Sequence, residues 1–124
     1  MVALLAAGCA ALAGQKPPRS MAWRVNLGRA PLAARELGNP FAGQPEALMA
    51  GRKLFRQNCA ECHLPDGRGQ RRAPDLSSPV IRNAPPGVLF WYLRNGNLNA
   101  GMPSWSRLPD QRLWQIVTYL KSER

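Results

Sequence analysis

The sequence predicts an all-α domain of three to four helices joined by long loops. Apolar residues recur at helical spacing in three separate segments, and no segment alternates between apolar and polar residues as a β-strand would. The stretches between them are rich in the 11 glycines and 12 prolines of the 124-residue chain, which suits loops. A chain of this length forms only a small apolar core, so a covalent staple or a buried cofactor would stabilise it.

The first helix is expected from Pro45 to about Asn58. Proline suits an early helical position, and the acidic Glu46 in the first turn complements the positive end of the helix dipole. One face of this helix carries residues at helical spacing: Leu48, Gly51, Leu54 and Phe55. The helix ends directly before two cysteines, which are only three positions apart.

Two further helices are expected after long loops. The second covers Gly87 to Asn95, and its inward residues are Leu89, Tyr92 and Leu93. The last begins at Pro109-Asp110 and runs to about Ser122, with a clear apolar stripe of Leu113, Ile116, Val117 and Leu120. Residues 64–86 and the stretch NGNLNAGMPSW are loops, and loops of this length in a small domain usually serve a function.

The chain divides into three parts. Residues 1–14 are predicted to be a signal segment, because Val2 to Ala13 is almost wholly apolar but shorter than the roughly 20 residues of a membrane-spanning helix. Residues 15–38 are rich in proline, glycine and alanine and are predicted to form a semi-extended tether. Residues 39–124 then form the folded domain.

Small residues directly precede the lone Cys9, as in a bacterial lipoprotein cleavage box. Cys9 would then become a lipidated N-terminus that anchors the protein to a membrane. The alternative is a simple signal peptide that is removed together with Cys9. Both interpretations predict an exported, periplasmic protein.

The net charge of +10 comes from 17 basic and 7 acidic residues. Such a surface attracts acidic proteins, anionic lipid or nucleic acid. We disfavour nucleic acid because the basic residues are scattered and no known nucleic-acid-reading motif is present.

The segment CAECH at residues 59–63 holds two of the three cysteines and the only histidine. C-x-x-C-H is the attachment signature of a c-type haem. Cysteines three apart on a helical turn can bond to two vinyl groups of one porphyrin. The histidine that follows is then brought beneath the iron as an axial ligand. We therefore expect one haem, covalently bound through Cys59 and Cys62 and ligated by His63.

Three other interpretations of this segment remain open. A thioredoxin-like redox pair would need a surrounding βαβ pattern, which is absent. A zinc site would need four ligands, and the predicted folded part has no other cysteine or histidine. The cysteines could also have no chemical role.

The second axial ligand is expected to be a methionine, a common partner of histidine that raises the reduction potential. The folded part offers Met49 and Met102. Met49 lies within the first helix, where a packing or surface role is favoured. Met102 lies in the loop segment Gly101-Met102-Pro103, which has no helical stripe for it to join, so we predict that Met102 is the ligand.

With these motifs in place, the sequence resembles the small mono-haem, class I cytochromes c, which have a histidine and a methionine as iron ligands. The resemblance covers roughly residues 39–122. It is carried by CAECH at 59–63, APDL at 73–76, GMP at 101–103 and the terminal helix around Trp114 and Tyr119. It implies the cytochrome c fold, in which three to four helices and long loops wrap round one covalently bound haem.

The resemblance also assigns roles to further residues. It implies that the carbonyl of Pro74 accepts the Nδ1–H of the ligand histidine, which would orient the ring and tune its basicity. It implies that the first and last helices cross, with Gly51 and Phe55 on one side and Trp114 and Tyr119 on the other. The tryptophans at 91 and 105 and Arg94 are weaker candidates for the haem surroundings.

An iron with both axial positions filled by protein has no open site for oxygen or substrate. This favours a monomeric single-electron carrier over an enzyme, docking to acidic faces of redox partners through weak, salt-sensitive contacts. Two alternatives are kept: an electron-accepting subunit of a periplasmic dehydrogenase or oxidase, and a haem sensor or peroxidase whose methionine ligand can be displaced.

Overall fold

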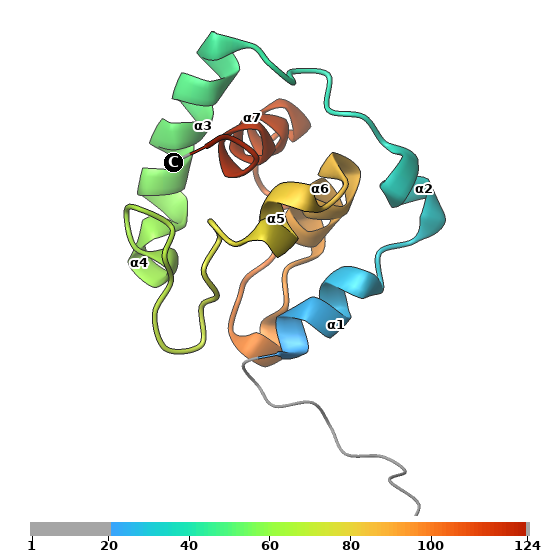
Figure 1. Cartoon of the computed structure of the whole chain (residues 1–124), viewed down its shortest axis with the longest axis vertical. Helices are drawn as coiled ribbons and strands as arrows, with labels where there is room; N and C mark the ends of the chain where they lie inside the picture. Colours follow the sequence, from blue (N-terminus) through green and yellow to red (C-terminus); the bar gives the residue numbers. More distant parts are fainter. Residues whose placement is uncertain (1–20, 124) are drawn as a thin grey trace, which may run out of the picture.

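Helices make up the regular secondary structure of the computed structural model, which describes residues 21–123 (Figure 1). The elements in chain order are α1 (Ala22–Gly28), α2 (Leu32–Glu36), α3 (Pro45–Asn58), α4 (Ala60–His63), α5 (Pro79–Asn83), α6 (Pro86–Asn95), the 3₁₀-helix η1 (Leu98–Ala100) and α7 (Asp110–Leu120). Within these residues, β-type pairing is limited to two isolated bridges. The all-α prediction is confirmed, but short helices also form in segments that the sequence analysis assigned to the tether and the loops.

The crossing of α3 and α7 brings two backbones into direct contact. A Cβ atom built on Gly51 of α3 would lie 1.9 Å from the carbonyl oxygen of Gln115 in α7, so only glycine fits here. Next to this point, the rings of Phe55 and Tyr119 pack with their centroids 5.3 Å apart, and Phe55 is completely buried. The predicted crossing is therefore confirmed for Gly51, Phe55 and Tyr119.

The core continues from this crossing towards α6. Trp114 of α7 stacks on Phe90 of α6, with ring centroids 4.1 Å apart and planes 13° from parallel. Offset or near-parallel aromatic pairs of this kind add to the stabilisation that buried apolar area already provides. The largest fully buried side chains are Phe55, Val88, Leu113, Ile116 and Val117. The stripe expected on the last helix is thus the centre of the core.

The segment predicted as a tether differs from expectation in its described part. Residues 22–36 form α1 and α2, and both helices pack against α6. Leu27, Ala30 and Ala34 are buried there. A Cβ on Gly87 of α6 would lie 1.9 Å from the carbonyl oxygen of Ala34, so small residues on both sides allow close approach. The helices are too short to produce a recognisable period, which is why the sequence pattern indicated a tether.

Arg35 joins these two helices into one unit. Its guanidinium donates hydrogen bonds to the carbonyl oxygens of Gly28 (2.7 Å) and Ala30 (3.1 Å), at the end of α1. The position of this cation is also favourable because the C-terminal end of a helix dipole is negative. The predicted signal segment 1–14, including Cys9, and the first residues of the predicted tether lie outside the described residues.

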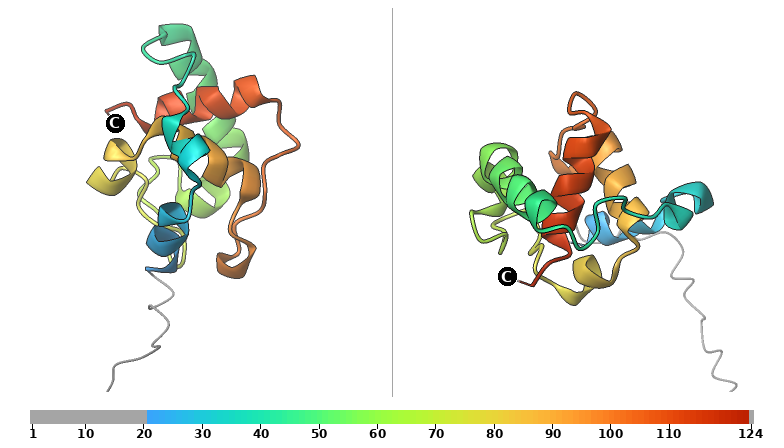
Figure 2. Two further views of the ribbon diagram at one scale, coloured as in Figure 1. Left: turned by 90° about the vertical axis from the view of Figure 1, so that its right-hand side faces the viewer. Right: turned by 90° about the horizontal axis from the view of Figure 1, so that it is seen from above.

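Figure 2 gives two further views of this arrangement. In Figure 1, α7 lies between α3 and α6, α2 lies on the side of α6 that faces away from α3, and α1 lies below α6. Within residues 21–123, no helix has the length and apolarity needed to cross a membrane.

We expect Gly51→Ala to lower the free energy of unfolding by at least about 2 kcal/mol, because overpacking of the α3–α7 contact outweighs the better helix propensity of alanine. Thermal or denaturant unfolding measures this change. Gly28→Ala is the control, since a Cβ at this other helical glycine meets nothing within 4 Å. If the two variants have equal free energies of unfolding, the α3–α7 contact does not require glycine at position 51.

Candidate functional site

One short turn at the end of α3 carries the residues of the C-x-x-C-H segment. Cys59 ends α3, with its amide donating to the carbonyl of Phe55 (2.8 Å), and it also begins α4. The amide of His63 then donates to the carbonyl of Cys59 (2.9 Å), which closes the turn. Cys59 is half-buried, Cys62 is exposed and His63 is buried. The packing of α3 on α7 therefore fixes the position of all three side chains.

The imidazole of His63 is held by the loop that follows it. Its Nδ1 lies 3.2 Å from the carbonyl oxygen of Pro74. Because a carbonyl can only accept, this contact is a hydrogen bond when Nδ1 carries the proton, and Nε2 then has a free lone pair. Burial lowers the pKa of His63 and outweighs the opposite effect of the Pro74 carbonyl. The ring is thus kept neutral and able to coordinate a metal through Nε2.

Gly69 positions the Pro74 carbonyl from its other side. Its backbone φ is +78°, and a Cβ there would lie 2.6 Å from the carbonyl oxygen of Pro74 and 2.4 Å from that of Ala73. The amide of Gly69 donates to the carbonyl of His63 (2.9 Å), so this glycine contacts both partners of the imidazole bond. Sequence reasoning missed Gly69; the signal was a second glycine in the turn-forming stretch PDGRG.

The two cysteines are free thiols with different surroundings. Burial, with a smaller contribution from nearby Cys62, raises the pKa of Cys59 to about 12. A thioredoxin-like redox pair lies beside a βαβ unit, and residues 21–123 contain no β-strand. The structure therefore disfavours the redox-pair interpretation. Among residues 21–123, no group of three or more histidine, cysteine, aspartate and glutamate side chains could hold a metal ion.

Met102 lies on a different segment, the loop between α6 and α7. Its amide and carbonyl form a two-way bridge with Asn97, with N···O distances of 3.0 Å and 2.9 Å. The side-chain amide of Asn97 donates to the hydroxyl of Tyr92 on α6 (2.9 Å). The half-buried Met102 side chain packs against the apolar core. The loop therefore holds Met102 at a defined place.

Gly96 fastens the same loop at its beginning. It ends α6 with φ +67°, and a Cβ there would lie 2.6 Å from the backbone of Pro103 and Ser104. Trp105 completes the closure, since its amide donates to the carbonyl of Leu93 (2.9 Å). Sequence reasoning missed Gly96, Asn97 and Tyr92, because only the folded loop brings them to Met102.

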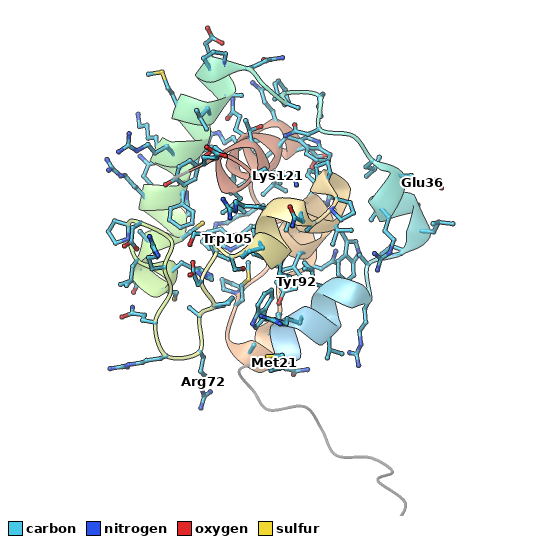
Figure 3. The ribbon with its side chains drawn as sticks, in the orientation of Figure 1. Met21, Glu36, Arg72, Tyr92, Trp105 and Lys121 are labelled. Atoms are coloured by element: carbon cyan, nitrogen blue, oxygen red, sulfur yellow. The ribbon has the colours of Figure 1, made fainter. Side chains whose placement is uncertain are left out.

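Among the weaker candidates, Arg94 has a surface partner, since its guanidinium forms an ion pair with Asp110. Trp105 is buried and its amide bonds to Leu93 of α6, and Trp91 is half-buried. On the loop after α4, Arg72 is exposed and extends away from the molecule (Figure 3). By direct contacts, the structure brings Cys59, Cys62, His63 and Pro74 together, while Met102 belongs to the separately braced loop.

Comparison with known proteins places this site in context. The family model described as "Cytochrome C oxidase, cbb3-type, subunit III" matches residues 46–120. The chain is 41% identical over 51 residues to the cbb3-type cytochrome c oxidase subunit CcoP of Rubrivivax gelatinosus, covering 39% of this chain and 17% of that protein. It is 34% identical over 98 residues to the cytochrome bc1 complex cytochrome c subunit of Corynebacterium efficiens, covering 75% of this chain and 32% of that protein.

A solved structure shares the fold. The cytochrome CL of the marine methylotroph Methylophaga aminisulfidivorans superposes with a TM-score of 0.57 and 22% identity, covering 90% of this chain and 69% of that one. The chain spans about a third or less of the length of the curated relatives named above. The match to residues 46–120 contains Cys59, Cys62, His63, Pro74 and Met102.

We expect Gly69→Ala to lower the free energy of unfolding by about 2–4 kcal/mol, because a methyl group would meet the Pro74 carbonyl and the positive φ would be strained. Displacement of that carbonyl should also speed the exchange of the His63 Nδ1 proton with solvent, which NMR detects. Gly43→Ala is the matched control: its φ is +74° but nothing lies within 4 Å of a Cβ there, so strain alone should cost about 1 kcal/mol. Unchanged proton exchange in Gly69→Ala would contradict this role.

Proposed function

Because the chain belongs to the cytochrome c family described as cytochrome c oxidase, cbb3-type, subunit III, we propose that it transfers single electrons through one covalently attached c-type haem. The observation that carries this proposal is the C-x-x-C-H turn, in which Nδ1 of the buried His63 lies 3.2 Å from the carbonyl oxygen of Pro74. A covalently bound haem c is what membership of this family implies.

The residues present fit a haem of this type. Cys59 and Cys62 are free thiols on one turn, available for two thioether bonds. The lowered pKa of His63 keeps its imidazole neutral, and the bond to Pro74 leaves Nε2 as the coordinating nitrogen. The thioether sulfur of Met102 is a soft ligand of the kind that pairs with histidine in electron-transfer sites.

Each residue then has a defined task. The haem, when bound, supplies a one-electron couple at its iron. Cys59 and Cys62 would attach the ring to the turn at α4, while His63 and Met102 would hold the iron from two separate segments. The contacts of Pro74 with His63 and of Asn97 with Met102 restrain both ligands, so their positions change little when the charge at the iron changes. Two protein ligands also leave no open position for a substrate.

We propose that the protein works outside the cytoplasm, where it exchanges electrons with redox proteins that present acidic faces. The net charge of +10 supports such encounters, which salt would screen. The apolar residues 2–13 and Cys9 support export, with a lipid on Cys9 as the proposed anchor.

A second function is favoured by the comparisons: the electron-accepting subunit of a membrane respiratory complex. The curated relatives are named as subunits of a cbb3-type oxidase and of a bc1 complex. Purification of the protein from native membranes separates the two functions, because a subunit would co-purify with a larger enzyme and a free carrier would not.

We expect the purified holoprotein to be red and to give the pyridine haemochrome spectrum of a c-type haem, with colour that acidic acetone does not extract. Thioether bonds to Cys59 and Cys62 are the reason for this resistance. The double variant Cys59→Ser/Cys62→Ser should release its haem to acidic acetone. A colourless protein would exclude the proposed function.

We expect Met102→Ala to lower the midpoint potential and to abolish the near-infrared sulfur-to-iron charge-transfer band, because loss of the thioether removes the ligand that raises the potential. Met49→Ala is the control, since Met49 is 73% exposed on α3. If the band persists in Met102→Ala and disappears in Met49→Ala, the ligand has been assigned to the wrong methionine.

A further inference from the structure

The outer side of α1 and α2 combines exposed apolar side chains with arginines that have no carboxylate partner among the described residues. Of the eight large apolar side chains that are exposed in the described residues, four lie between positions 21 and 37. These are Met21 (40% exposed), Val25 (44%), Leu32 (70%) and Leu37 (47%). Arg24 on α1, Arg29 directly after α1 and Arg35 on α2 are exposed as well. We call the surface formed by Met21, Arg24, Val25, Arg29, Leu32 and Arg35 the α1–α2 surface.

The charge on this surface has one sign. Residues 21–35 contain three arginines and no acidic residue, and the first carboxylate, Glu36, follows at the end of α2. None of the three arginines forms an ion pair with a carboxylate in the part of the chain that the structure describes. Met21 and Glu36, labelled in Figure 3, mark the two ends of the surface, and Glu36 points outward from α2.

Trp23 adds an aromatic side chain to the same helix. It is half-buried against the core, and the guanidinium of Arg24 lies 5.3 Å from the centroid of its ring. Tryptophan and arginine next to exposed aliphatic side chains are the residues that favour the boundary between lipid headgroups and acyl chains. Leu32, which is 70% exposed at the start of α2, adds apolar area to this surface.

The chain before α1 supports the same conclusion. With the proposed lipid on Cys9, residues 10–20 separate the anchor from Met21, and eleven extended residues span at most about 40 Å. If that lipid lies in a bilayer, α1 is therefore the described element nearest to the anchor along the chain. Residues 14–20 also carry two cations, Lys16 and Arg19, and no acid.

We propose that the α1–α2 surface binds the surface of an anionic lipid bilayer. This extends the anchored location proposed above and does not depend on which residues ligate the iron. The apolar side chains enter the headgroup region while the arginines pair with lipid phosphates. Because α3 and α4 lie on the side of the molecule away from α2 (Figures 1 and 2), the bilayer then leaves α4, which carries the exposed Cys62, uncovered. Binding in this orientation presents the C-x-x-C-H turn to aqueous partners.

The test is sedimentation of the full-length holoprotein with phosphatidylcholine vesicles, with and without an equal share of phosphatidylglycerol. We expect binding to the anionic vesicles, and we expect Arg24→Glu/Arg29→Glu to weaken it by more than about tenfold. Arg52→Glu/Lys53→Glu on the exposed face of α3 is the matched control, because it changes the net charge equally on the opposite side. This control should alter binding by less than about twofold.

Hydrogen exchange on vesicle-bound protein locates the contact even if residues 1–20 also bind lipid. We expect slower exchange in residues 21–37 and no change in residues 45–58. Protection of 45–58 instead, or equal weakening by both charge-reversal pairs, would overturn the proposal in favour of general charge attraction.

Two other outcomes would also overturn it. One is the absence of binding to anionic vesicles. The other is vesicle binding unchanged by Arg24→Glu/Arg29→Glu while electron exchange with an acidic redox protein slows, which would assign the surface to a protein partner. The haemochrome spectrum of each variant keeps these results separate from any failure of the proposed function.

Discussion

The backbone contact between α3 and α7 is the constraint on which the rest of the structure depends. It exists because Gly51 has no side chain, and the Gln115 carbonyl occupies the space where one would be. The contact fixes α3 along its length, and the end of α3 is the turn that carries Cys59, Cys62 and His63. The site is thus positioned by helix packing, and the aromatic pair of Phe55 and Tyr119 buries the adjoining space.

The same physical device recurs at three other places. Gly69, Gly87 and Gly96 each lie so close to a neighbouring backbone that a Cβ would overlap it. Gly69 supports the carbonyl that orients His63, and Gly96 holds the loop that carries Met102. Gly87 admits α2 against α6. The two proposed ligands therefore come from separate segments, and each is restrained by hydrogen bonds to its own surroundings. This arrangement suits a site that changes its charge without changing its shape.

The N-terminal helices give the molecule two different sides. One side carries the C-x-x-C-H turn and the arginines of the loop after it, while the other carries the apolar and basic surface of α1 and α2 (Figure 2). A protein that receives electrons on one face gains from a fixed orientation, because the frequency of productive encounters depends on which face is presented. The contacts that Arg35 makes with the end of α1 hold the two short helices together. Helices of five and seven residues would not be stable in isolation.

The sequence by itself determined the helical class, the positions of α3, α6 and α7, and the residues of the C-x-x-C-H turn. These follow from local periods and from spacing within one turn, which need no tertiary information. It also indicated Pro74, through resemblance to a known family, and the structure has the expected contact at His63. Only the tertiary structure decided that residues 22–36 are helices packed on α6, and that Gly69, Gly96 and Asn97 brace the two ligand segments. Each of these contacts joins residues that are far apart in the sequence or that lie in segments too short to show a periodic pattern. The local sequence therefore does not predict which residues they contact.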